Sequence, residues 1–364
     1  MKVAIVGATG ETGNSIVEGL LAATDTKFKQ DITALIRPSS LKKPEVSDLE
    51  KKGVKIAAAD LRGPEDELTK QLTGIDVVIS TILSSELRDE IPLANAAKKA
   101  GVKRFVPCFF GPVMPGRGMV WFRDDKENTL NHVQTLYLPY TVIDVGWWYQ
   151  ISLPRVPSGR LDSIMRLTDN CIVGDGNKVC GRTDLRDIGN YVARIIADPR
   201  TLNQKVFAYT DLRTHNEVYD LIEKLSGEKI ERQYVRSNTN PPPLKKKTKI
   251  KRPGSSNETL AMFQLLSAED IEAEIAKVKG DEANINKLSV LQYQKSWDLR
   301  GDNCPDYARY LGYQIAKDLY PDFTGISFED YCKEALEGKS KPLYEKKRRE
   351  AIAAMQQKAA EGQT

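Results

Sequence analysis

Short apolar runs alternate with amphipathic segments along the first 145 residues of the chain. Six of these runs are nearly continuously apolar, which is typical of parallel strands buried on both faces. They lie at Val3–Val6, Ile32–Ile36, Val54–Ala58, Val77–Ser80, Phe105–Pro107 and Thr141–Asp144. Segments between them carry apolar residues at helical spacing, as at Asn14–Ala23 and Ile91–Ala100. Strands that alternate with helices predict βαβ units and a doubly wound parallel α/β sheet.

After Gly146 the alternation is less regular, which predicts a chain that weaves between two lobes. Three later segments still follow the pattern of the first half and are expected to return to the sheet: Asp187–Ala197, Val206–Tyr209 and His215–Leu225. The predicted sheet domain takes residues 1–150, with 182–227 returning to it. Residues 151–181 and 228–340 are assigned to a smaller C-terminal lobe.

Two charged segments stand outside this pattern. Residues 240–258 contain three consecutive prolines followed by KKKTKIKR, and they predict a flexible loop. A nuclear-localisation or anion-binding patch is the alternative for this loop, although runs of like charge are usually just solvent-exposed. Residues 344–364 predict a charged helical tail with too few heptads for a coiled coil.

Composition and charge exclude several classes of protein. A net charge of +4 over 364 residues gives no reason to expect a nucleic-acid or membrane partner. No apolar run approaches the roughly 20 residues that span a bilayer, and Met1-Lys2 leads straight into a strand, which argues against a signal peptide. Five scattered cysteines without CxxC spacing, and only two histidines, predict free thiols and no metal site. Free thiols fit a reducing, cytoplasmic compartment.

The sequence GATGETG at residues 7–13 follows the first strand and opens the first helix. Gly7 is expected to end the strand in a tight turn, Gly10 to let the backbone approach a pyrophosphate, and Gly13 to let the helix pack near the strand. The helix N-terminus would present N–H groups and its positive dipole end to the phosphates. The loop predicts a nicotinamide dinucleotide in a Rossmann-type domain, with these contacts: Gly7, Thr9, Gly10, Glu11, Thr12 and Gly13.

The end of the second strand selects between the two nicotinamide cofactors. A carboxylate there would hold the adenosine ribose of NAD, but the chain reads LIRP at residues 35–38. Arg37 can meet a 2′-phosphate with its planar guanidinium, and Lys42 follows closely. NADP(H) is therefore the predicted cofactor, with a surface arginine as the alternative. Asp60 after the third strand and Thr81 after the fourth are expected at the adenine and ribose, because of the topology.

The sequence lacks the catalytic tyrosine of an ordinary short-chain dehydrogenase. Such an enzyme would place a catalytic tyrosine four residues before its lysine. Phe122 stands at that spacing before Lys126, so the proton donor must be another group.

Several segments together resemble the isoflavone reductase-like family, the NmrA-like branch of atypical short-chain reductases, which includes phenylcoumaran benzylic ether and pinoresinol–lariciresinol reductases. They are GATGETG, Arg37, VKRFVPCFFG at 102–111, Lys126 and PYT at 139–141, with further matches at 174–177, 186–189 and 198–203. The resemblance covers about residues 1–235 and recurs in 320–336. It implies a Rossmann doubly wound sheet with a smaller C-terminal substrate lobe, NADP(H) and a small-molecule substrate.

The resemblance also implies a catalytic lysine. Family members place it thirteen residues before the proline of the PYT element, and Lys126 has that separation from Pro139. Such a lysine would lie on the first turn of a helix, near the nicotinamide ribose and the substrate oxygen. It would act as a general acid or base, or stabilise developing oxyanion charge. The alternative is a surface lysine paired with a neighbouring carboxylate: Asp124, Asp125 or Glu127.

One element departs from the family. The familiar PSEFG reads Pro107-Cys108-Phe109-Phe110-Gly111 here, which replaces a hydroxyl and a carboxylate by a thiol and a ring. Cys108 and Phe109 are still expected beside the cofactor, and Phe110 in a substrate pocket that is more apolar than in the family. Cys108 is interpreted as a buried packing cysteine, with a redox-sensitive thiol as the alternative.

Aromatic residues follow the sixth strand. Trp147, Trp148 and Tyr149 come directly after Gly146, where strand ends face the ligand crevice of an open sheet. They predict stacking on an aromatic substrate or on the nicotinamide. Aromatic packing between the two lobes is an equally weighted alternative.

The leading hypothesis is an NADPH-dependent reductase of a small, aromatic or conjugated metabolite, with Lys126 handling the proton or the negative charge. The rival is an NmrA-like regulator that senses NADP(H) through a protein partner and does no chemistry. The sequence carries no interface pattern, so a homodimer is left open.

Overall fold

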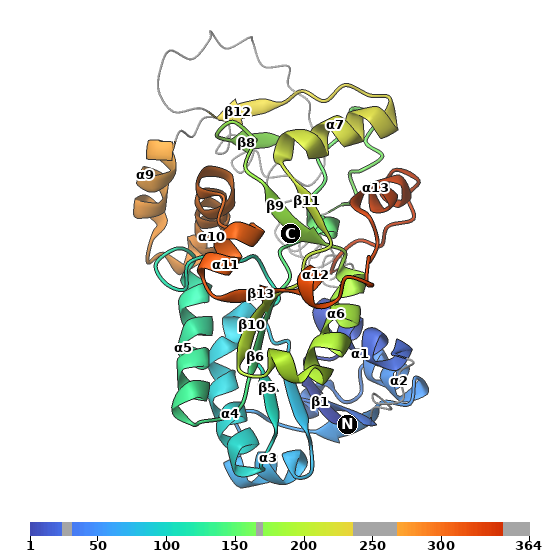
Figure 1. Cartoon of the computed structure of the whole chain (residues 1–364), viewed down its shortest axis with the longest axis vertical. Helices are drawn as coiled ribbons and strands as arrows, with labels where there is room; N and C mark the ends of the chain where they lie inside the picture. Colours follow the sequence, from blue (N-terminus) through green and yellow to red (C-terminus); the bar gives the residue numbers. More distant parts are fainter. Residues whose placement is uncertain (24–30, 165–169, 236–267, 345–364) are drawn as a thin grey trace, which may run out of the picture.

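A parallel sheet organises the first half of the chain (Figure 1). The computed structural model describes residues 1–23, 31–164, 170–235 and 268–344. Five strands of the sheet run in the order β3-β2-β1-β4-β5. Their bounds are β1 Lys2–Val6, β2 Asp31–Ile36, β3 Lys55–Ala58, β4 Val77–Ser80 and β5 Arg104–Val106. The predicted parallel α/β fold is confirmed.

Three further strands extend the sheet beyond β5. A single parallel bridge between Phe105 and Tyr140 places β6 (Thr141–Asp144) beside β5. β10 (Gln204–Phe207) pairs in parallel with β6. β13 (Tyr313–Ile315) pairs with β10, although its residues were assigned to the smaller lobe. That assignment is wrong at β13 because a three-residue strand with a central glutamine leaves no apolar run to recognise.

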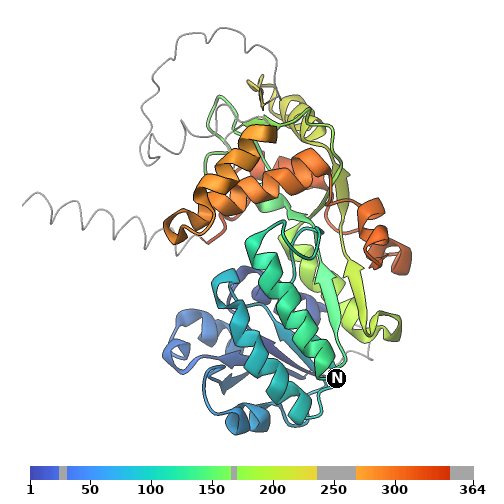
Figure 2. The same ribbon diagram turned by 90° about the vertical axis from the view of Figure 1, so that its left-hand side faces the viewer.

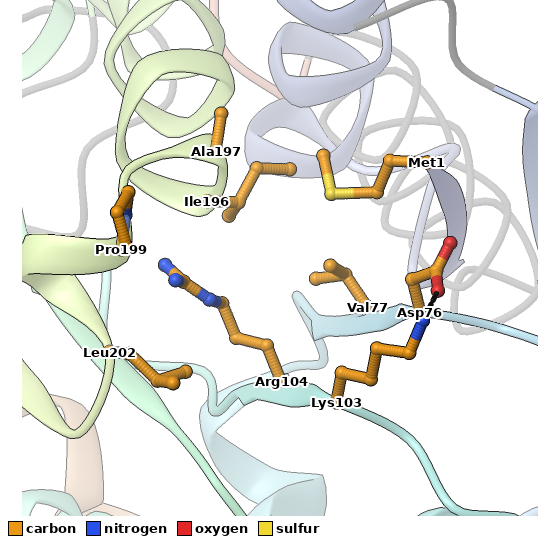
Figure 3. A pocket seen from close by; sticks show the side chains of 9 residues that line it. All are labelled: Met1, Asp76, Val77, Lys103, Arg104, Ile196, Ala197, Pro199 and Leu202. Atoms are coloured by element: carbon orange, nitrogen blue, oxygen red, sulfur yellow. Dashed lines mark hydrogen bonds and ion pairs between the residues drawn. The ribbon is translucent and has the colours of Figure 1, made fainter. Parts of the chain in front are cut away.

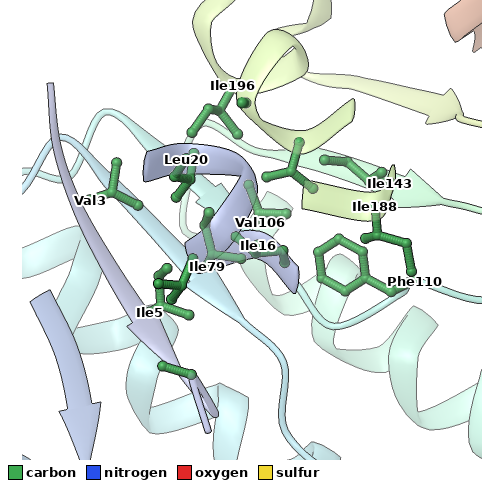
Figure 4. Close-up of a cluster of buried hydrophobic side chains, with 14 of the residues drawn as sticks. Val3, Ile5, Ile16, Leu20, Ile79, Val106, Phe110, Ile143, Ile188 and Ile196 are labelled. Atoms are coloured by element: carbon green, nitrogen blue, oxygen red, sulfur yellow. The ribbon is translucent and has the colours of Figure 1, made fainter. Parts of the chain in front are cut away.

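Helices cover both faces of the sheet. The first face carries α1 Glu11–Ala22, α2 Pro44–Lys51 and α6 Leu185–Ala197, and the second carries α3 Glu65–Leu72, α4 Glu90–Lys99 and α5 Trp121–Thr135. Successive residues of β1 serve the two cores in turn, since Val3 and Ile5 belong to the first and Ala4 and Val6 to the second. Figure 4 shows the first core, between the strands and the helices α1 and α6.

The contact between α1 and α6 fixes where the glycine loop sits. A methyl group on Gly189 of α6 would lie 1.9 Å from the backbone oxygen of Ser15, so only glycine permits this approach. The Ser15 hydroxyl donates to Leu185 O at 2.5 Å and accepts from Gly189 N at 3.1 Å. Helix α1 is therefore held against α6 one turn after the loop that opens it.

Most of the remaining elements gather beyond one end of the sheet in both views, while α11 (Pro305–Tyr310) and α12 (Ala316–Leu319) lie beside β13 (Figures 1 and 2). One small sheet joins β7 Trp147–Trp148, β9 Cys180–Thr183 and β11 Asp211–Arg213, and another joins β8 Cys171–Val173 and β12 Gln233–Val235. The other helices are α7 His215–Ser226, α9 Ala268–Val278, α10 Ile285–Tyr293, a π-helix Gln294–Arg300 and α13 Phe328–Leu336.

Short 3₁₀ turns complete the described chain, at Pro38–Ser40, Ser84–Asp89, Tyr149–Ile151, Pro199–Thr201 and Glu282–Asn284. The predicted loop at 240–258 and residues 345–364 of the predicted tail lie outside the described residues. The domain boundaries at residues 150, 181 and 227 stay predictions. In the described ranges, no helix combines the length and the apolar character needed to cross a membrane.

Candidate active site

The glycine loop has the geometry that its sequence predicts. Gly7 has a φ of +80°, and a methyl group there would lie 2.6 Å from the backbone oxygen of Thr81. A methyl group on Gly13 would lie 2.1 Å from Gly7 O, and Gly10 N donates to that same oxygen at 2.9 Å. The N-cap of α1, Gly10, makes no side-chain cap, so no side chain there competes for the N–H groups of the first turn. This cradle fits a dinucleotide pyrophosphate.

Other predicted cofactor residues follow the strands that flank the loop. The strand order reverses between β1 and β4, and ligands of open α/β sheets bind at such a switch point. Arg37 follows β2, Asp60 follows β3 and Thr81 follows β4, so all three end at one edge of the sheet. The Thr81 hydroxyl is already engaged, since it donates to Val6 O at 2.8 Å. Arg37, Lys42 and Asp60 are exposed.

Glu11 of the glycine loop contacts Tyr344, which the sequence analysis placed at the start of a charged helical tail. Its carboxylate accepts a hydrogen bond from the backbone N of Tyr344 at 2.9 Å. Leu343 is buried against the first core, and Tyr344 has a φ of +51° in a turn. The predicted tail helix therefore does not begin at Tyr344, because a left-handed residue cannot start a right-handed helix.

Lys126 lies on the buried face of α5. It is the sixth residue of that helix and thus in its second turn, which corrects the expected first turn. The helix begins at Trp121, directly after its extended N-cap residue Val120. Arg123, Lys126 and Leu130 share the buried face at helical spacing. Only 8% of Lys126 is exposed.

The lysine ammonium has a specific partner. Nζ donates to the backbone oxygen of Phe109 at 2.5 Å. It also lies 5.8 Å from the ring centroid of Phe109 and 5.6 Å from that of Phe122, which favours its charged form. The neighbouring carboxylates bind elsewhere: Asp124 accepts from Gly118 N, Asp125 faces Arg88 and Glu127 pairs with Arg123. The alternative of a surface ion pair is therefore wrong.

The environment of Lys126 lowers its pKa. Burial is the main cause, and the charge of Arg123 adds to it, while Cys108, Asp144 and Glu90 act in the opposite direction. A lysine with a depressed pKa gives up its proton more readily near neutral pH. The position is suited to general acid–base chemistry.

A buried ion pair ties α5 to the sheet beside Lys126. Arg123 Nη1 lies 3.0 and 3.3 Å from the carboxylate oxygens of Asp144, at the end of β6. Arg123 Nη2 donates to the Tyr313 hydroxyl at 2.8 Å, and this hydroxyl donates to Asp144 at 2.6 Å. The guanidinium also stacks 4.5 Å from the ring centroid of Phe109. Sequence reasoning missed this network, although a carboxylate ending an apolar strand was a usable signal.

The two phenylalanine rings of the loop after β5 do not lie where they were predicted. Phe109 and Phe110 are 1% and 4% exposed, so their rings do not face a ligand. Phe109 was expected at the cofactor, but its ring packs in a core cluster and only its carbonyl serves Lys126. Phe110 was expected in the substrate pocket, but it joins the first core beside Ile143 and Ile188 (Figure 4). Its φ of +32° turns the side chain inward.

Cys108 is a buried packing thiol. Burial raises its pKa to about 12, and its Sγ donates to Ile82 O at 3.2 Å. The redox-sensitive alternative loses support, because the thiolate is the reactive form. Cys108 N donates to the Glu90 carboxyl at 2.8 Å, a residue that the sequence analysis did not single out.

The three aromatic residues after Gly146 pack into three different clusters. Trp147 packs against Trp297 and Tyr293, with ring centroids 4.2 and 5.3 Å apart, and Tyr293 contacts Phe122 at 5.6 Å. This cluster connects the π-helix to the ring beside Lys126. Trp148 packs, partly buried, against the first core.

Tyr149 does not belong to the predicted substrate pocket. Its side chain is fully buried and packs against Phe328 and Tyr331, with centroids 4.9 and 5.6 Å apart. The error arises because β7 lasts only two residues, after which the chain turns into the core of the smaller sheets.

Two features of the described residues can be set apart from the candidate active site: a hollow at the other end of the sheet, and the question of a metal site. A hollow of about 390 Å³ lies at the amino ends of β1, β4 and β5, opposite the glycine loop (Figure 3). Arg104 on its wall donates to Ile195 O, Asp198 O and the Thr201 hydroxyl, which gives it a structural role. Over the residues that can be described, no three His, Cys, Asp or Glu side chains gather as metal ligands.

Comparison with known proteins gives consistent matches. A model of the NmrA-like family matches residues 1–292. The chain is 46% identical over 340 residues to asnovolin J 5′,6′-dehydrogenase of Aspergillus novofumigatus, covering 93% of this chain and 96% of that protein. It is 32% identical over 248 residues to phenylcoumaran benzylic ether reductase Betv6 of Betula pendula, covering 64% and 77%.

Solved structures share the fold. Leucoanthocyanidin reductase from Vitis vinifera, in a binary complex with NADPH, matches with a TM-score of 0.70 at 21% identity. The match covers 93% of this chain and 100% of that chain.

Proposed function

The chain belongs to the NmrA-like family, as its motifs predicted, and from this premise we propose that it is an NADP(H)-dependent oxidoreductase of a small, aromatic or conjugated metabolite. The observation that carries the proposal is Lys126, a buried lysine whose ammonium is held by Phe109 O at the end of the sheet that carries the glycine loop. Two curated relatives with this family resemblance are named as a dehydrogenase and a reductase.

The glycine loop and Arg37 would hold the cofactor. Gly7, Gly10 and Gly13 leave room for the pyrophosphate at the N-terminus of α1, and Arg37 would pair with the 2′-phosphate. The bound nicotinamide would supply or accept a hydride. The NADPH complex of the Vitis vinifera neighbour, which has the same fold, supports this choice of cofactor.

Lys126 would handle the proton or the negative charge. An ammonium has three N–H donors, and within the described ranges one of them is engaged, by Phe109 O. A second donor can therefore bind a substrate oxygen, stabilise its developing charge and then protonate it. The burial that lowers the pKa of Lys126 makes this transfer easier.

The regulatory alternative is not favoured. The relatives at 46% and 32% identity are named as enzymes. A sensor without turnover also has no need for a lysine desolvated between two aromatic rings, since burial of an ammonium costs free energy.

The test is turnover in both directions. NADPH oxidation is followed with phenolic, quinone and enone compounds, and NADP⁺ reduction with their reduced counterparts. Lys126→Met is expected to lower kcat at least about 100-fold while NADPH binding stays within about threefold. Lys98→Met is the matched control, because Lys98 Nζ also donates to a backbone oxygen, that of Tyr137, at an exposed site. Tight NADPH binding with no turnover of any compound would count against the proposal.

Two further features of the protein stay predictions. A homodimer is tested by light scattering of the purified chain, and a cytoplasmic location by imaging of the tagged chain. The substrate is expected to be a small molecule, without a nucleic-acid or membrane partner.

A further inference from the structure

Glu90 is a buried carboxyl at the first residue of α4. Its side chain has no exposed surface, and Oε1 accepts a hydrogen bond from Cys108 N at 2.8 Å. Among the described residues, no well-aligned hydrogen bond reaches Oε2, but the hydroxyls of Ser80 and Thr129 face the carboxyl and favour its ionised form. A carboxyl buried this deeply is costly to ionise, so the groups around it must stabilise its charge.

Glu90 and Lys126 hold one short loop from two sides. The Glu90 carboxyl takes the N–H of Cys108, and the Lys126 ammonium binds the carbonyl of Phe109, the next residue. The two side chains come from different helices, α4 and α5, and meet at this dipeptide. They also attract each other electrostatically, since each favours the ionised form of the other.

We propose that Glu90 is a positioning residue for Lys126, fixing the loop that holds the ammonium and providing the negative charge that keeps the lysine protonated. The proposal rests on the proposed function of Lys126. It assigns a role to a carboxyl that, in the described part of the chain, contacts neither the glycine loop nor the aromatic cluster.

The groups around Glu90 and Lys126 explain why Glu90 is the counter-charge of the lysine. Lys126 and Thr129 face it from α5, Ser80 from β4 and the Cys108 thiol and N–H from the loop after β5. Three other groups act on Lys126. The Cys108 thiol is uncharged near neutral pH, because burial raises its pKa to about 12, and Arg123 and Asp144 pair with each other at 3.0 Å. Because they largely compensate, Glu90 is the counter-charge that can still vary.

The charge of Glu90 changes near neutral pH. Burial raises the pKa of this carboxyl to about 7, against the opposing effects of Ser80, Cys108 N and Lys126. Below that pH the carboxyl is neutral and no longer raises the proton affinity of Lys126. The proton affinity of Lys126 is therefore highest when Glu90 is ionised.

Glu90→Gln tests the proposal without removing the loop contact, since the amide oxygen can still accept from Cys108 N. Asp89→Asn is the matched control, because the neighbouring Asp89 carboxylate pairs instead with the exposed Arg62. The protein is labelled with ¹³C at lysine Cε, and the Lys126 resonance is assigned by its loss in Lys126→Met. Its titration is then recorded in wild type, Glu90→Gln and Asp89→Asn.

We expect Glu90→Gln to weaken the proton affinity of Lys126 about tenfold, which moves the titration midpoint down by about one pH unit. Asp89→Asn should leave it unchanged. In turnover, the alkaline limb of the kcat/KM profile should move down with the midpoint in Glu90→Gln alone. Glu90→Asp, which keeps the charge, should recover part of the shift.

Two results would overturn the inference. One is a Lys126 titration in Glu90→Gln that superimposes on wild type. The other is an equal shift in Asp89→Asn, which would indicate a general effect of charge. Failure of the proposed function is distinguishable, because absent turnover leaves the lysine titration measurable and decisive on its own.

Discussion

The guanidinium of Arg37 is paired with the carboxylate of Glu86, with Nη1 and Oε1 2.9 Å apart. Arg37 follows β2 and Glu86 precedes α4, so the pair spans the switch point between β1 and β4. The two side chains are 60% and 25% exposed, and such pairs contribute at most about 1 kcal/mol. A 2′-phosphate can therefore displace Glu86 from Arg37 at small cost.

Arg37→Ala is expected to weaken NADPH binding about 10- to 100-fold and NADH binding less than about twofold. The reason is the loss of a charge-assisted contact that only the 2′-phosphate makes. Calorimetric titration with both cofactors measures the ratio. Arg309→Ala is the control, since Arg309 is similarly exposed and pairs with Asp318. Equal losses for NADPH and NADH would show that Arg37 does not select the cofactor.

Glu86→Gln should have the opposite effect. It frees Arg37 and removes a negative charge near the expected phosphate, so NADPH affinity should rise about two- to fivefold at low salt. NADH affinity should stay the same, and the gain should shrink as salt is added. A gain of the same size for NADH would contradict the placement of the 2′-phosphate beside Arg37.

The strands of the sheet were predictable because burial on both faces leaves continuous apolar runs. Val77–Ser80 and Thr141–Asp144 have the predicted bounds. Lys126 could be singled out from the family resemblance through its separation from Pro139, and Gly7 and Gly13 from the steric needs of a phosphate loop. These features depend on local sequence, which is why they can be predicted without knowledge of the tertiary structure.

Other features depend on contacts between distant segments. Glu90 lies in a polar stretch and resembles a surface residue, and only the packing of α4 against the loop after β5 buries it. Tyr149 and Phe110 were assigned to a pocket from their place after strands, but a two-residue strand and a left-handed residue turn them into cores. Tyr344 reaches Glu11 across most of the chain. No local sequence pattern encodes which distant segment a side chain will contact.

The α1–α6 contact predicts a sensitive position. Gly189→Ala would place a methyl group 1.9 Å from Ser15 O, and because that atom is backbone, a helix must move. We expect a loss of about 2–3 kcal/mol in the free energy of unfolding, together with weaker NADPH binding, since α1 carries the loop. Urea denaturation measures the first. Gly116→Ala is the control, because the nearest neighbour of its methyl group would be the Glu127 side chain at 3.1 Å and not backbone.

The cysteines should differ sharply in reactivity. All five are free, and four are buried, whereas Cys304 is partly exposed. Burial raises the pKa of Cys108 and of Cys171 to about 12, so few thiolates form at neutral pH. Maleimide should label the native protein at Cys304 alone, and Cys304→Ser should abolish rapid labelling. Rapid labelling of Cys108 in that variant would revive a redox role for it.

Glu90 also makes a prediction about stability. Its pKa is about 7 in the folded protein against an ordinary 4.5, so the folded state binds this proton more tightly than the unfolded state. Stability is therefore lost as pH rises from 4.5, and the loss is complete above about pH 7. At about 1.4 kcal/mol per pKa unit, the penalty approaches about 3 kcal/mol.

Glu90→Gln removes this titration and should be the more stable protein above pH 7, with an advantage that shrinks toward about pH 5. Urea denaturation of both proteins at about pH 5 and pH 8 measures the difference. Asp89→Asn should show no such pH-dependent gain, because its partly buried carboxylate pairs with the exposed Arg62. An advantage of equal size at both pH values would mean that the Glu90 carboxyl does not change its charge in this range. Glu90 could not then act as the variable counter-charge of Lys126.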